Sequence, residues 1–126
     1  MAIPPKEEYP ELRGIMFDDS FVLGWNLSEQ KFCIDIELSI WPESEFYTKP
    51  VNQEYTCYKK AQLVFKEFES LTGLLEQTDT MRSTDATGEV DYGNIDYFGV
   101  EGKNFRLTGA FGDVTISNAD LEIRWL

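Results

Sequence analysis

Histidine is absent from this chain of 126 residues, and cysteine occurs only twice, at Cys33 and Cys57. Without histidine the chain cannot form a Ser-His-Asp or Cys-His catalytic centre, or a metal site with imidazole ligands. The cysteines form no C-x-x-C pair, so neither a disulfide framework nor a zinc knuckle is indicated. We therefore expect two reduced thiols that pack within the fold, with Cys33 partly exposed, and we expect no cofactor.

Basic residues are scarce: Lys and Arg number 11 against 23 Asp and Glu, which gives a net charge of −12. No basic stripe occurs, and binding to a phosphate backbone depends on Lys and Arg that displace counterions. The acidity is concentrated in residues 67–101, which carry nine acids and one base, a sum of −8. Nucleic acid is therefore not expected as a partner, and the charge favours a basic protein. The ordinary explanation, that acidity keeps a small protein soluble, applies as well.

Long apolar runs are also lacking. No segment approaches the roughly 18 to 20 apolar residues of a membrane span, and residues 1–14 lack the apolar centre of a signal peptide. No G-x-x-x-x-G-K-[ST] loop is present, so nucleotide binding is not indicated. We expect a soluble, cytoplasmic protein without a membrane partner, and the sequence leaves its oligomeric state open.

What the sequence does contain is alternation of apolar and polar residues, the pattern of half-buried β-strands. The clearest run is 31–40, in which every second residue is apolar. A short turn at 28–30 predicts that this strand pairs antiparallel with a strand over 21–27. The polar residues 18–20 are expected to separate that strand from the short apolar run 15–17.

The carboxyl-terminal run 103–126 predicts three short antiparallel strands that form a meander. Turns at 109–113 and 117–120 separate them, and a further short strand is predicted over 95–100. Each strand offers one apolar face and one wet face, so this part of the chain is expected to act as the scaffold.

The stretch 54–77 fits two patterns. Its apolar residues recur at spacings of three and four, as on an amphipathic helix, and they also alternate with period two, as on a strand. The adjacent Thr72 and Gly73 stand against a helix, and the β-favouring residues 55–58 lead into the segment. We predict a strand with a bulge over 55–68 and keep a helix as the alternative.

These patterns together predict an all-β protein: an antiparallel β-sandwich or partly open barrel of about seven to nine short strands, with at most one short helix. The length of the chain suits a single β domain over 1–126. Its proline-rich residues 1–11 are expected to form an extended arm, and the polar stretch 78–88 is expected to form a mobile loop.

Aromatic residues beside prolines and glycines are the main indication of a binding surface. Trp41 precedes Pro42 and Tyr92 precedes Gly93, so these rings are expected either to be exposed or to fold back over the core. The binding residues we predict are Asp91, Tyr92, Asp96, Tyr97 and Trp41. Exposed aromatics among carboxylates suit a protein-binding face, and they also suit a sugar-stacking platform built from Trp25, Trp41 or Tyr92.

Carboxylates provide two further interpretations. Two pairs could serve a carboxylate-based hydrolase, Asp35 with Glu37 on one side of a strand, or Asp91 with Asp96. A calcium site could draw on Asp79, Asp85, Glu89, Asp91 and Asp96, but the spacing of an EF-hand loop is missing. Acidic runs are usually solvated outer-face residues, so we predict neither a catalytic residue nor a metal ligand.

Four stretches that combine apolar and turn residues span most of the chain: FDDS at 17–20, YKKAQLVF at 58–65, VDYGNID at 90–96 and FRLTGAFG at 105–112. In this order they resemble short bacterial all-β proteins, the immunity proteins of polymorphic toxin systems. The resemblance implies a non-enzymatic protein that binds and blocks a partner, and the acidity suits a basic, nuclease-like target. It assigns no binding residue.

Overall fold

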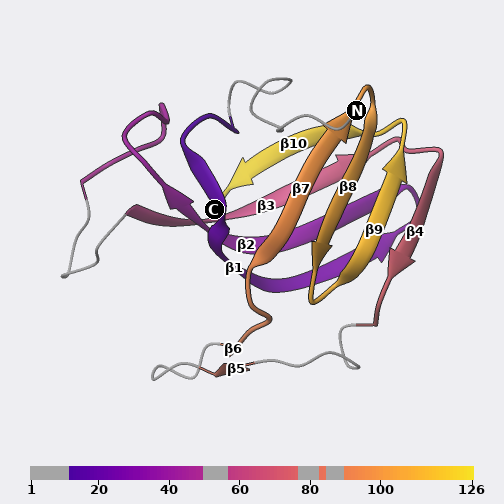
Figure 1. Cartoon of the computed structure of the whole chain (residues 1–126), viewed down its shortest axis with the longest axis horizontal. Coiled ribbons are helices and arrows are strands. Elements are labelled where there is room, and N and C mark those ends of the chain that lie inside the picture. Colours follow the sequence, from indigo (N-terminus) through magenta and orange to yellow (C-terminus); the bar gives the residue numbers. More distant parts are fainter. Residues whose placement is uncertain (1–11, 50–56, 77–82, 85–89) are drawn as a thin grey trace.

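The chain folds into β-strands in the computed structural model, which describes residues 12–49, 57–76, 83–84 and 90–126 (Figure 1). The strands are β1 (Ile15–Ser28), β2 (Lys31–Ile40), β3 (Cys57–Lys66), β4 (Ser70–Leu74), β5 (Ser83–Thr84), β6 (Val90–Asp91), β7 (Ile95–Glu101), β8 (Asn104–Gly109), β9 (Gly112–Ser117) and β10 (Asp120–Trp125). The described part contains no α-helix.

Eight of these strands form two antiparallel four-stranded sheets, in the orders β1-β2-β3-β10 and β4-β9-β8-β7. The strands of one sheet cross those of the other in Figure 1, and the apolar faces of both sheets meet between them. The fold is therefore a β-sandwich, which confirms the predicted all-β class and decides against a closed barrel. β5 and β6 form a separate small pair.

The predicted hairpin of residues 21–27 with 31–40 is present, but its first strand is longer than expected. The run 18–20 does not end the strand. The pairing register changes between Met16 and Phe21, so these residues form a bulge within β1. Beyond the bulge, Ile15 pairs with Ile40, so β1 continues to the end of β2. Bulges bend a strand without ending it, and a polar run in the sequence does not distinguish the two outcomes.

The strand predicted over 55–68 is confirmed as β3, and the helical alternative is wrong. β3 lies between β2 and β10, with Ala61, Leu63 and Phe65 completely buried toward the core. The predicted bulge is also wrong, since the pairing of β3 with both neighbours is continuous. The strand ends at Lys66, and Glu67 (φ 58°) turns the chain toward β4 in the other sheet. Residues 55 and 56 lie outside the described residues.

The predicted three-stranded meander at the carboxyl end is only partly correct. β8 and β9 pair as a hairpin, but β10 leaves them and pairs with β3 in the first sheet. Asn118 (φ 58°) makes the turn, and the buried Ala119 carries the chain across the sandwich. Alternation identifies a strand with one apolar face, but either sheet of a sandwich can accept that face. The charge-neutral run 103–126 thus contributes to both layers.

Aromatic rings tie the two layers together. Phe65 of β3 packs edge-on against Phe105 of β8 with ring centroids 5.1 Å apart, and Phe17 of β1 lies 4.9 Å from Phe98 of β7. Aromatic pairs at such distances add to the stability that burial of the rings provides. Within the stretch predicted as a mobile loop over 78–88, Ser83–Thr84 form a strand that pairs with β6; the rest of that stretch and the predicted arm 1–11 lie outside the described residues.

Candidate functional site

An open cleft of about 360 Å³ lies at the end of the first sheet where β2 leaves it. We call it the Trp41 cleft. Its lining residues are Arg13, Gly14, Ile15, Met16, Trp41 and Glu43. The cleft therefore contains one of the predicted binding residues, together with a methionine and two residues of opposite charge.

Backbone contacts fix Trp41 in this cleft. Its amide donates to the carbonyl of Gly14 (2.8 Å), and its carbonyl accepts from the amide of Ser44 (2.9 Å). Gly14 has φ +80°, and a Cβ added to it would lie 2.4 Å from the Ser44 nitrogen. Only glycine allows this close approach, so the segment before β1 and the loop after β2 form one supported unit.

The apolar side chains of the cleft are accessible. Trp41 and Met16 keep 41% and 42% of their surface exposed, so the cleft presents two large apolar side chains to a partner. The lining carries one base, Arg13, and one acid, Glu43, and the segments 12–21 and 41–49 that contain the lining residues together carry four acids and two bases. Tryptophan, methionine and arginine are enriched in protein interfaces, with tryptophan and arginine prominent among the residues that dominate binding energy.

The predicted exposure of Tyr92 is wrong. Tyr92 is only 9% exposed and packs edge-on against Trp25 with ring centroids 5.0 Å apart. Its amide donates to the carbonyl of Val22, and the amide of Val22 donates to the carbonyl of Gly93, so this segment covers the edge of β1. Tyr92 therefore helps to close the core. Its neighbour Asp91 belongs to β6 and pairs through the backbone with Ser83.

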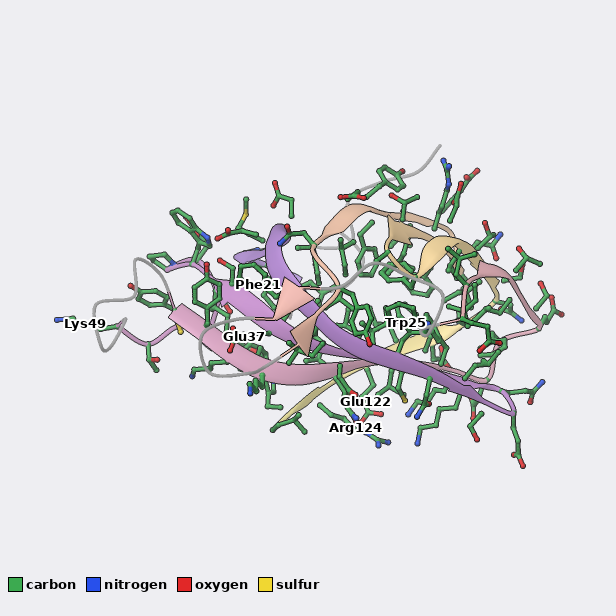
Figure 2. All side chains as sticks on the ribbon, turned by 90° about the horizontal axis from the view of Figure 1, so that it is seen from below. Phe21, Trp25, Glu37, Lys49, Glu122 and Arg124 are labelled. Atoms are coloured by element: carbon green, nitrogen blue, oxygen red, sulfur yellow. The ribbon has the colours of Figure 1, made fainter. Side chains whose placement is uncertain are left out.

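Trp25 is also buried, with 8% of its surface exposed. Its indole Nε1 donates to the carbonyl of Leu75 (3.0 Å), and Figure 2 shows the side chain among those packed between the ribbons. Of the three aromatics considered for a sugar-stacking platform, Trp41 alone is substantially exposed. The burial of Trp25 and Tyr92 depends on contacts between distant segments, which the neighbouring residues in the sequence do not reveal.

Asp96 and Tyr97 are exposed on β7 in the second sheet. The ring of Tyr97 lies against the backbone of Gly99, and the guanidinium of Arg106 lies 5.7 Å from the ring centroid. Arg106 also binds Asp113 through two hydrogen bonds of 3.0 and 2.8 Å. The ring of Tyr97 is thus already engaged by its own sheet, a cation–π arrangement that leaves less of it for a ligand.

The contact between Arg106 and Asp113 shifts the pKa values of both side chains. The hydrogen bond from the guanidinium, followed by its charge, lowers the pKa of Asp113, and the same contact raises the pKa of Arg106. Both side chains are more than half exposed, so solvent screens the pair. We interpret it as a feature that orders the outer face of the second sheet.

The predicted site residues therefore do not form one site. Trp41 lies in a cleft of the first sheet, Asp96 and Tyr97 lie on the second sheet, and Tyr92 lies in the core. Sequence reasoning missed Met16, which is exposed and lines the same cleft as Trp41. The signal was weak, because Met16 falls within the apolar run 15–17 and its outward direction depends on the register of β1.

Of the two carboxylate pairs considered for hydrolysis, Asp35 and Glu37 lie on the outer face of β2, whereas Asp91 belongs to β6 and Asp96 to β7. Asp35 accepts a hydrogen bond of 2.7 Å from Nε2 of Gln62 on β3, and Glu37 lies opposite Phe21 of β1 (Figure 2). Neither Asp35 nor Glu37 is among the described residues that line the Trp41 cleft. The hydrolase interpretation stays a prediction that these contacts do not test.

Metal binding finds no support in the part of the chain that the structure describes, where no cluster of three or more potential ligands occurs. Three of the five carboxylates considered for calcium, Asp79, Asp85 and Glu89, lie outside that part. Cys33 is partly exposed and Cys57 is buried, and both are free thiols, as expected.

Comparison of the chain with models of protein families, with curated proteins and with solved structures found no match. Within the described residues, no helix has the length and apolarity to cross a membrane. Function therefore has to be inferred from the clefts, exposed side chains and charges of this fold.

Proposed function

We propose that this chain is a non-enzymatic protein-binding module that recognises a basic protein through the Trp41 cleft. The observation that carries the proposal is the presence of two large, exposed apolar side chains, Trp41 and Met16, in one cleft whose backbone depends on Gly14. A rigid aromatic anchor with a polar rim is the usual centre of a protein interface.

Charge supports the choice of a basic partner. The chain carries a net charge of −12, and the acids outnumber the bases in the segments that frame the cleft. An acidic surface attracts a basic partner during encounter and disfavours acidic competitors. Blocking of a basic toxin, an immunity-type role, is the form of this function that the acidity and the resemblance of the sequence favour.

Affinity capture with matched variants tests this proposal. The full chain is immobilised and exposed to native lysate as wild type, as Trp41→Ser and as Leu75→Ser. Leu75 is a suitable control because it is 51% exposed and lines a different cleft. We expect a basic protein that the wild type and the Leu75 variant retain and that Trp41→Ser loses. Identical captured proteins for all three chains would contradict the proposal.

A saccharide-binding function is the alternative that Trp41 alone still supports. A sugar ring stacked on the exposed indole would stabilise the folded chain by about 2.7 kcal/mol at one hundred times its dissociation constant. Thermal-shift screening against a panel of saccharides measures this directly. Stabilisation of the wild type that Trp41→Ser abolishes would favour the alternative, and the absence of any shift across the panel would remove it.

A further inference from the structure

A second and larger groove, of about 650 Å³, opens at the end of β3 and β10. We call it the Lys59 groove. Its lining residues are Phe46, Lys59, Lys60, Trp125 and Leu126. Among the described residues it shares no lining residue with the Trp41 cleft, so it does not depend on the function proposed above.

The register of the first sheet explains why this groove exists. Trp125, the last residue of β10, pairs with Ala61, so β10 ends before it reaches Lys59. Lys59 pairs with Leu38 on its other side, and Leu38 is completely buried. Lys59 therefore occupies a position of the core-facing row of β3, beyond the point where β10 ends beside β3.

Aromatic rings form the apolar wall of the groove. The ring of Phe46 lies 4.6 Å from that of Trp125, between centroids, with the two planes tilted by 39°. The amide of Phe46 donates to Oγ of Ser44 (3.1 Å), which holds the loop residue in place. Both rings are partly exposed, so they offer an apolar aromatic surface to a ligand.

Lys59 supplies a cation next to this wall. Its half-buried side chain makes no hydrogen bond or ion pair with any residue that the structure describes. Lys66 of β3 differs, because it faces the opposite side of the sheet and binds Glu122 at 3.2 Å. The chain has about twice as many acids as bases, yet Lys59 has no carboxylate partner among the described residues. A half-buried ammonium group of this kind favours an anionic ligand, because hydrogen bonds between charged groups are the stronger ones.

We propose that the Lys59 groove binds a small organic anion with a flat apolar ring, an aromatic carboxylate. The ring would lie against Phe46 and Trp125, and the carboxylate would accept a hydrogen bond from Nζ of Lys59. The volume of the groove falls within the roughly 300 to 1,000 Å³ typical of small-molecule sites. Apolar walls with a few placed polar groups are the usual composition of such sites.

The test uses 2-naphthoate and its neutral analogue 2-naphthamide as probes of the full chain, with affinity measured by titration calorimetry. We expect the wild type to bind the carboxylate about tenfold more tightly than the amide, as for a hydrogen bond to a charged group. Lys59→Gln should weaken binding of the carboxylate by about the same factor and leave binding of the amide unchanged. Lys66→Gln is the matched control and should change neither affinity.

Two results would overturn the proposal. One is no binding of 2-naphthoate to the wild type at concentrations on the order of 10 mM, tenfold above the ~1 mM that roughly 0.3 kcal/mol per non-hydrogen atom gives. The other is equal affinities for the carboxylate and the amide. Trp125→Leu provides an independent readout, because it should weaken both probes through loss of the ring wall. Should Lys59→Gln fail to fold, the comparison of the two probes on the wild type still decides whether the groove selects a negative charge.

Discussion

Gly14 supports Trp41 through backbone contacts that a side chain would prevent. A Cβ at this position would lie 2.4 Å from the Ser44 nitrogen and 2.9 Å from the Glu43 carbonyl carbon, in a backbone conformation with φ +80°. We predict that Gly14→Ala lowers the free energy of unfolding by more than about 2 kcal/mol, because backbone strain and a backbone clash add. Urea denaturation monitored by tryptophan fluorescence measures the change.

Gly102→Ala is the control for this prediction. Gly102 also has a positive φ, of 60°, but nothing lies within 4 Å of the position of its Cβ. Only the conformational cost of about 1 kcal/mol is therefore expected. If the two variants lost equal stability, the contact between Gly14 and the loop after β2 would not be the feature that holds Trp41.

Asp113 should titrate at an unusually low pH because Arg106 stabilises its carboxylate. Its pKa in the folded chain lies below its unfolded value of ~3.9, so the stabilising contribution is present above that pH. This contribution is lost as pH falls through the lowered folded-state pKa. We predict that NMR titration finds a depressed pKa for Asp113 and that Arg106→Gln returns it toward the usual value.

Lys103→Gln is the matched control for the titration, since Lys103 binds a different carboxylate, Asp120, at 3.4 Å. It should leave the pKa of Asp113 unchanged. A normal pKa for Asp113 in the wild type would show that the exposed Arg106–Asp113 pair does not persist in solution.

At the level of elements, the bulge in β1 depends on Ser20. The buried hydroxyl of Ser20 accepts a hydrogen bond from the amide of Ser39 (2.9 Å) and donates one to the carbonyl of Met16 (2.7 Å). We predict that Ser20→Ala destabilises the fold by about 1 to 3 kcal/mol, because the amide of Ser39 would lose its partner inside the protein. Chemical denaturation is the measurement, and the exposed Ser70→Ala should change stability by less than about 0.5 kcal/mol.

The strands themselves could be predicted from the sequence where one face is apolar over many residues. β2 alternates without interruption, and β3 was correctly preferred over a helix because β-favouring residues lead into it. The pairing of β10 could not be predicted. Its apolar face, which includes Leu121 and Ile123, fits either sheet, and its place beside β3 depends on contacts far apart in the chain.

The candidate sites were less predictable than the fold for a related reason. Trp41 could be identified because the following proline ends the ladder and leaves its side chain at the edge of the sheet. Tyr92 was misjudged because a nearby glycine suggested an exposed turn, whereas its ring packs against Trp25, far away in the sequence. The Lys59 groove arises because β10 ends at the residue opposite Ala61, a matter of register that the alternation of apolar residues does not contain.

For the whole molecule, the net charge of −12 should control how fast a basic partner associates. We predict that the association rate constant of the captured partner falls by roughly tenfold as salt rises from low to high ionic strength, because screening weakens long-range attraction. Stopped-flow or surface-based kinetics measure it. A rate that does not respond to salt would remove the electrostatic part of the account, and the contribution of Trp41 would then stand alone.

The affinity of the captured partner for wild type and for Trp41→Ala tests the central claim most directly. Trp41 is the largest exposed side chain of its cleft, so its truncation should weaken binding by about 2 kcal/mol or more, roughly thirtyfold in the dissociation constant. Titration calorimetry gives both constants, and circular dichroism confirms that the variant folds. A folded variant that binds the partner as tightly as the wild type would contradict the assignment of the Trp41 cleft as the binding site.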